Sequence, residues 1–134
     1  MKHPDLKILS QIFNNFGEIQ AVYLFGSTAA GNLHQESDLD LAIYPGSESL
    51  KKKKLLILTE LARHGFDNVD LIFLDGNDII LEYEAVRQNR LVYQKKYFDR
   101  GTLYSNTVRK YLDFYPFLLV QRKAYKMRLL NGTT

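Results

Sequence analysis

The chain has 134 residues and no cysteine. Disulfide bonds, thiolate zinc sites and a cysteine nucleophile are therefore excluded, and the absence fits a reducing compartment. The N-terminal segment lacks the apolar run of a signal peptide, and no stretch approaches the roughly 20 apolar residues that a membrane span needs. These absences predict a soluble, cytoplasmic protein without a membrane partner.

A strong excess of one charge is also missing, because the formal net charge is only +3 and the pI is near 9.0. A charge this small permits nucleic-acid binding without arguing for it. The distribution is uneven, since residues 99–134 carry a net charge of +5 and the rest about −2. We therefore expect acidic chemistry in the first part of the chain and a basic C-terminal extension.

Hydrophobic periodicity alternates between the strand and helix patterns, which predicts an α/β domain. The predicted helices cover 4–16, 49–64, 78–87 and 98–130, with a kink or break at Pro116, and the predicted strands cover 19–25, 38–44, 68–74 and 90–94. A further helical turn is expected at 28–31. We divide the chain into a core at 1–96 and a helical extension at 97–134, which packs on the core or on a partner.

Three features that could carry chemistry lie on three consecutive predicted strands. Gly26-Ser27 ends the first strand, Asp38 and Asp40 lie two apart on the second, and Asp70 interrupts the apolar third strand. Residues two apart on a strand point to the same face, so the first two carboxylates should converge and repel each other unless a cation lies between them. Magnesium prefers such oxygen ligands. An acid in an apolar strand is costly unless it is paired or bound to metal.

Each feature also has a simpler interpretation. Asp-x-Asp pairs are common, Gly-Ser after a strand is usually a turn, and a lone aspartate in an apolar strand is more often held by a hydrogen-bond partner. The combination in this order favours nucleotidyl transfer, in which metal ions hold a triphosphate and lower the pKa of an acceptor hydroxyl. Asp70 could accept the hydroxyl proton. Gly26 would let the backbone approach a phosphate, and Ser27 could donate a hydrogen bond.

The segment FGSTAAGNLHQESDLDLAIY, residues 25–44, resembles the signature of the DNA polymerase β-like nucleotidyltransferases. It contains Gly-Ser, a ten-residue spacer and Asp-x-Asp, and Asp70 matches the third acid on a later strand. The spacing resembles that of minimal nucleotidyltransferases, which include the antitoxins of HEPN–MNT toxin–antitoxin pairs. The resemblance implies a small mixed sheet flanked by helices, followed by the C-terminal helical extension.

The resemblance also implies an activity and a role for each matching residue. The antitoxins transfer AMP from ATP to a tyrosine of the HEPN ribonuclease toxin and so neutralise it. Gly26 and Ser27 would contact the nucleotide phosphates. Asp38 and Asp40 would bind two magnesium ions, while Asp70 would bind one of them and act as the base.

One departure from the family pattern keeps alternatives open. Many members carry arginines after the Gly-Ser, where this chain has Thr28 and Ala30, so the phosphate grip is weaker or comes from a basic group elsewhere. The chain could instead be a non-catalytic antitoxin that captures its partner, or a nucleotidyltransferase acting on RNA or a small molecule. The aromatic and basic extension could bind a partner protein or pack on the sheet. Binding of nucleic acid is a weaker alternative.

Overall fold

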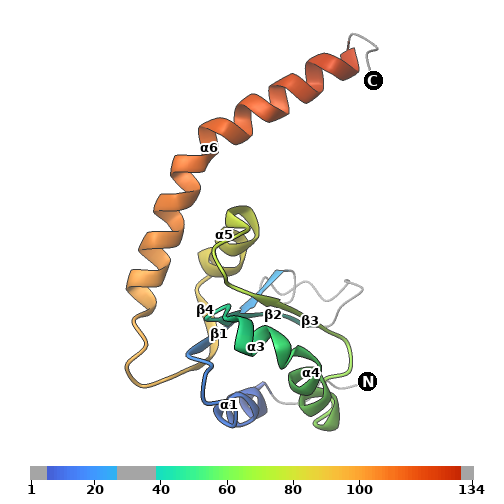
Figure 1. Cartoon of the computed structure of the whole chain (residues 1–134), viewed down its shortest axis with the longest axis vertical. Helices are drawn as coiled ribbons and strands as arrows, with labels where there is room; N and C mark the ends of the chain where they lie inside the picture. The colour runs from blue at the N-terminus through green and yellow to red at the C-terminus, as the bar shows by residue number, and fades with distance from the viewer. Residues whose placement is uncertain (1–5, 27–38, 131–134) are drawn as a thin grey trace.

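The computed structural model describes residues 6–26 and 39–130, which form a mixed β-sheet with helices on both faces (Figure 1). The sheet has the strand order β3-β2-β1-β4. The strands are β1 (Ala21–Phe25), β2 (Leu39–Tyr44), β3 (Val69–Phe73) and β4 (Arg90–Gln94). Strand β1 is antiparallel to β2 and to β4, whereas β2 and β3 are parallel. The predicted α/β class and mixed sheet are confirmed.

The helices form a layer on each side of the sheet. On one side lie α1 (Lys7–Asn14), α3 (Glu48–Lys52) and α4 (Lys54–Arg63), and on the other lie α5 (Ile79–Arg87) and the first half of α6 (Arg100–Leu130). Strand β2 shows why both layers form. Leu39, Leu41 and Ile43 enter the core beneath the first layer, while Ala42 enters the second core beneath α5. The alternation of side chains along a strand divides its residues between two cores.

Two predicted helices differ from the structure in detail. The helix expected over 49–64 is interrupted at Lys53, whose backbone N–H donates to the Leu50 carbonyl at 2.9 Å and so forms a tight turn between α3 and α4. Of the kink or break expected at Pro116, the break is absent, because α6 is continuous from Arg100 to Leu130. Proline has no N–H to donate to the preceding turn, and α6 curves along its length in Figure 1.

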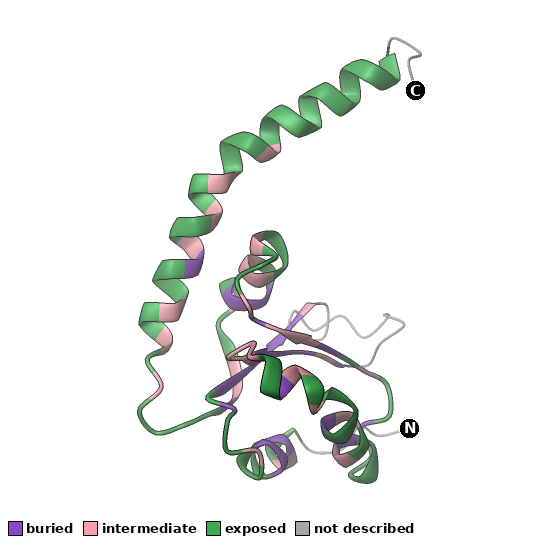
Figure 2. Ribbon diagram, in the orientation of Figure 1, coloured by how far each residue is buried: buried purple, intermediate pink, exposed green. Residues whose placement is uncertain are grey.

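The two halves of α6 have different surroundings. In the first half Thr107 is buried against α5, and the Tyr111 ring stacks on Tyr83 with centroids 3.8 Å apart and an angle of 7° between the planes. Beyond Leu118 every described residue of α6 is exposed (Figure 2). No helix in the described ranges combines the length and apolar character needed to cross a membrane.

Tyr23 lies in the middle of the sheet and is fully buried beneath α5 and α6. Its hydroxyl has no hydrogen-bond partner among the residues that the structure describes. Burial raises the pKa of the Tyr23 phenol to about 12, partly opposed by the positive charge of Arg100. A buried hydroxyl without a partner loses its hydration without compensation, which costs stability.

We therefore expect Tyr23→Phe to raise the free energy of unfolding by about 1 kcal/mol at pH 8. The pKa is higher in the folded state, so the wild type loses stability as pH rises above about 10, whereas the variant lacks this term. The difference in unfolding free energy between Tyr23→Phe and the wild type should therefore increase by about 1 kcal/mol between pH 8 and pH 11. Urea denaturation at both pH values measures it. Tyr93→Phe is the control, because the Tyr93 hydroxyl donates to Asn14 Oδ1 at 3.4 Å and its removal should give no gain.

Candidate active site

Two of the predicted acidic residues lie side by side on neighbouring strands. Asp40 in β2 and Asp70 in β3 are direct partners in the parallel register. Neighbouring strands lie about 4.8 Å apart and paired residues point to the same face, so the two carboxylates share one patch of the sheet. Asp40 is half-buried and Asp70 is exposed. The pairing brings together two acids that are 30 positions apart in the sequence.

The surroundings of Asp70 differ from the sequence-based expectation in one respect. We expected an acid embedded among apolar side chains, but α5 covers Ile72 and Leu74 on this face and leaves the Asp70 end of β3 exposed. The Asp70 side chain forms no hydrogen bond or ion pair with any residue inside the described ranges. The carboxylate is therefore available to a ligand from solvent and is not held by a structural partner there.

Gly26 fixes the position of the Asp40 carboxylate from the end of β1. Phe25 pairs with Asp40 across the sheet, and Gly26 follows with a φ of 73°, in the left-handed region that favours glycine. A Cβ atom built on Gly26 would lie 2.4 Å from Asp40 Oδ2 and 3.2 Å from its Cγ. The carboxylate therefore packs directly against the glycine backbone, and any larger residue would displace it.

The remaining predicted site residues, Ser27 and Asp38, lie outside the described residues, as does the helical turn expected at 28–31. Within the described ranges no group of three or more acidic or histidine side chains could hold a metal ion. The described part of the site thus consists of Gly26, Asp40 and Asp70.

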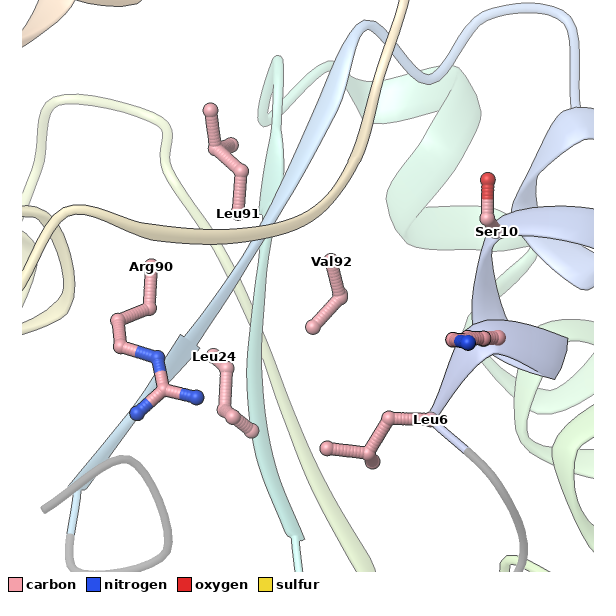
Figure 3. Close-up of a pocket in the computed structure, with 7 residues that line it drawn as sticks. Leu6, Ser10, Leu24, Arg90, Leu91 and Val92 are labelled. Carbon is pink, nitrogen blue, oxygen red and sulfur yellow. The ribbon is translucent and has the colours of Figure 1, made fainter.

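A pocket of about 360 Å³ opens between α1 and β4 (Figure 3). It is lined by Leu6, Lys7, Ser10, Leu24, Arg90, Leu91 and Val92. Arg90 begins β4 and pairs with Leu24, two residues before Gly26, so it lies at the same end of the sheet but on the α1 face, opposite the face that carries Asp40 and Asp70. Sequence reasoning missed this pocket, because only the pairing of β4 with β1 brings Arg90 there.

Comparison with known proteins agrees with this geometry. The family described as "Polymerase beta, Nucleotidyltransferase" matches residues 7–98, which contain the whole sheet. The chain belongs to this family. A curated relative, "Protein adenylyltransferase MntA" from Shewanella oneidensis, is 28% identical over 87 residues. The match covers 65% of this chain and 63% of the relative, so the chain spans less than two thirds of that protein's length.

Solved structures of toxin–antitoxin proteins share the fold. One is a crystal structure of a variant of the toxin–antitoxin MntA-HpeT, with a TM-score of 0.68, 20% identity, and coverage of 94% of this chain and 98% of that one. Another is the tri-AMPylated Shewanella oneidensis HEPN toxin in complex with its MNT antitoxin, with a TM-score of 0.60, 21% identity, and coverage of 92% and 93%. At this identity the likeness establishes the fold alone. Coverage this high includes most of the long C-terminal helix.

Proposed function

We propose that this chain is a magnesium-dependent protein adenylyltransferase that moves AMP from ATP onto a hydroxyl of a partner protein. The observation that carries the proposal is the in-register pair of Asp40 and Asp70, with the Asp40 carboxylate held against the backbone of Gly26. Membership of the nucleotidyltransferase family supports it.

The residues present fit a divalent cation. Two carboxylates on one patch of the sheet provide the oxygen ligands that magnesium prefers, and Asp70 has no competing partner among the described residues. Asp40 and Asp70 would hold the metal, together with Asp38, which precedes Asp40 by two residues in the sequence, and the sequence pattern suits two ions. Bound magnesium would neutralise phosphate charge and lower the pKa of the acceptor hydroxyl.

The protein residues would then position the reactants and move one proton. Gly26 offers a backbone without a side chain, which lets a phosphate come close, and Ser27 would donate a hydroxyl hydrogen bond. The acceptor oxygen bonds to the α-phosphorus of ATP, the bond to the β-phosphate oxygen breaks, and pyrophosphate leaves. Asp70 would accept the acceptor hydroxyl proton, because its exposed carboxylate faces the same patch as Asp40.

For the acceptor, we propose a tyrosine hydroxyl of a cognate HEPN ribonuclease toxin, which the transfer would neutralise. The support comes from the name of the relative, a protein adenylyltransferase, and from a solved complex in which an AMPylated HEPN toxin accompanies an MNT antitoxin. Transfer to RNA or a small molecule remains an alternative, since the fold does not determine the acceptor.

A second candidate function is neutralisation by steric capture without transfer. The exposed second half of α6 favours it, because an apolar and basic helix that leaves the body of the protein is suited to binding. Capture and transfer are compatible in one protein, so the question is which of them neutralises the partner.

Intact-mass spectrometry of a co-expressed HEPN partner tests the proposal. The native chain is expected to add one or more AMP units to the partner, and the Asp38→Asn, Asp40→Asn double variant is expected to add none. A mass gain of AMP units with the native chain that is lost with the double variant would identify the transferred group, show that the acceptor is a protein and show that the acidic residues are required. An unmodified partner in a stable complex with the native chain would refute the transferase and favour capture.

A further inference from the structure

The second half of α6 carries a regular apolar seam that nothing in the described structure covers. Phe117, Val120, Ala124 and Met127 follow the 3-4-3 spacing of core positions in a coiled coil. Phe117 is 66% exposed, Val120 67% and Met127 51%. Burying apolar side chains of this kind in a contact is favourable, so the exposed seam could contribute binding energy to a complex.

The charges beside the seam identify what could cover it. Lys123 lies beside the seam on one side, and Arg128 lies beside it on the other. Arg122 and Lys126 add two more positive charges to this half of the helix. No aspartate or glutamate stands between Asp113 and Leu130. In a coiled coil, charged residues beside the core favour a partner helix with opposite charges at the facing positions.

A second copy of this chain is therefore a poor occupant. In a parallel pair of α6 helices Lys123 would approach Arg128 of the other copy, and in an antiparallel pair each cation would approach its own counterpart. Like charges meet in both arrangements, and no acidic residue in this half of α6 compensates them.

A membrane surface is also a poor occupant. Helices that lie in a membrane interface have one apolar face and one strongly polar face. On α6 a second set of apolar residues, Leu118, Tyr125 and Leu129, projects from a different side of the helix than Phe117 and Val120. The helix therefore has no single polar side to face water.

We propose that residues 117–130 form a docking seam for an α-helix of a partner protein, with apolar side chains facing the seam and glutamate or aspartate beside Lys123. The inference rests on the proposed function in that the HEPN toxin is the partner expected to supply this helix. The packed first half of α6, anchored by the Tyr83–Tyr111 stack, would hold the seam in a fixed orientation.

The test measures the dissociation constant between the full chain and a HEPN partner by calorimetry. Val120→Gln combined with Met127→Gln is expected to weaken binding at least a hundredfold, because two polar amides would be buried in an apolar contact. Leu119→Gln is the matched control, since this neighbouring exposed leucine lies off both apolar sets and should change binding less than threefold.

Charge reversal gives a second, independent comparison. Lys123→Glu is expected to weaken binding about tenfold by facing the acidic side chains of the partner, whereas Arg122→Glu, on the opposite side of the helix, makes the same charge change and should have little effect. Equal effects of the two variants would contradict an acidic partner beside Lys123.

Several results would overturn the docking seam. Unchanged binding in the Val120→Gln, Met127→Gln variant refutes it while leaving the transferase untouched, because AMP transfer is measured separately by mass. Self-association of the free chain in light scattering, lost in this variant, assigns the seam to a second copy. Binding to vesicles containing phosphatidylserine, lost in the same variant, assigns it to a membrane. A wild-type chain that forms no complex refutes both the partner and the seam.

Discussion

Replacing Asp70 by asparagine is expected to reduce AMP transfer about a thousandfold while leaving the protein at least as stable as the wild type. A general base contributes roughly 10²–10⁴-fold to a proton transfer, and asparagine cannot accept the proton. The exposed Asp70 carboxylate makes no hydrogen bond or ion pair with the described residues, so the change breaks no structural contact among them. It also removes a negative charge that lies beside Asp40 on the neighbouring strand.

Two measurements on the same samples separate a functional role from a structural one. Transfer is followed by the mass of the partner, and stability by the urea midpoint in metal-free buffer. Magnesium should raise the melting temperature of the wild type more than that of Asp70→Asn, because the variant has lost a ligand. Asp67→Asn, an exposed change of the same charge just before β3, should alter none of these. Full transfer activity in Asp70→Asn would show that Asp70 is not part of the active site. Unfolding of the variant would show that Asp70 has a structural role.

The fold was largely predictable because its signals are local. Each described strand and helix corresponds to a segment predicted from its own periodicity, apart from the interruption at Lys53 that divides α3 from α4. A helix over 98–130 was predicted, with a kink or break at Pro116. Proline is a local signal for either outcome, and the sequence did not show that the helix continues through it.

The sequence proposed the acidic residues of the candidate site but gave no indication of their surroundings. Strand geometry predicts that Asp38 and Asp40 share one face, but the register that pairs Asp40 with Asp70 depends on contacts between distant segments. The exposure of Asp70 depends on where α5 crosses the sheet, which no local pattern encodes. Arg90 reaches the same end of the sheet through the pairing of β4 with β1, and its own sequence neighbours give no sign of this.

Gly26→Ala is expected to reduce AMP transfer about a hundredfold with a loss of only 1–2 kcal/mol in stability. The left-handed backbone at Gly26 costs roughly 1–2 kcal/mol for a residue with a Cβ atom. The new methyl group would meet Asp40 Oδ2, the far end of a side chain that can rotate away. The fold relieves the clash cheaply by moving the carboxylate, but a misplacement of about 1 Å in a reacting group can cost a hundredfold in rate.

Gly76→Ala provides a matched control for Gly26→Ala. Gly76 has a φ of 85° and no atom within 4 Å of a built Cβ, so alanine there carries the same backbone strain without a clash. Both variants should lose a similar 1–2 kcal/mol in urea denaturation, and only Gly26→Ala should lose transfer. Equal transfer by the two variants would mean that catalysis tolerates a displaced Asp40 carboxylate. Slow transfer by both would attribute the defect to stability, because strain is the only effect that they share.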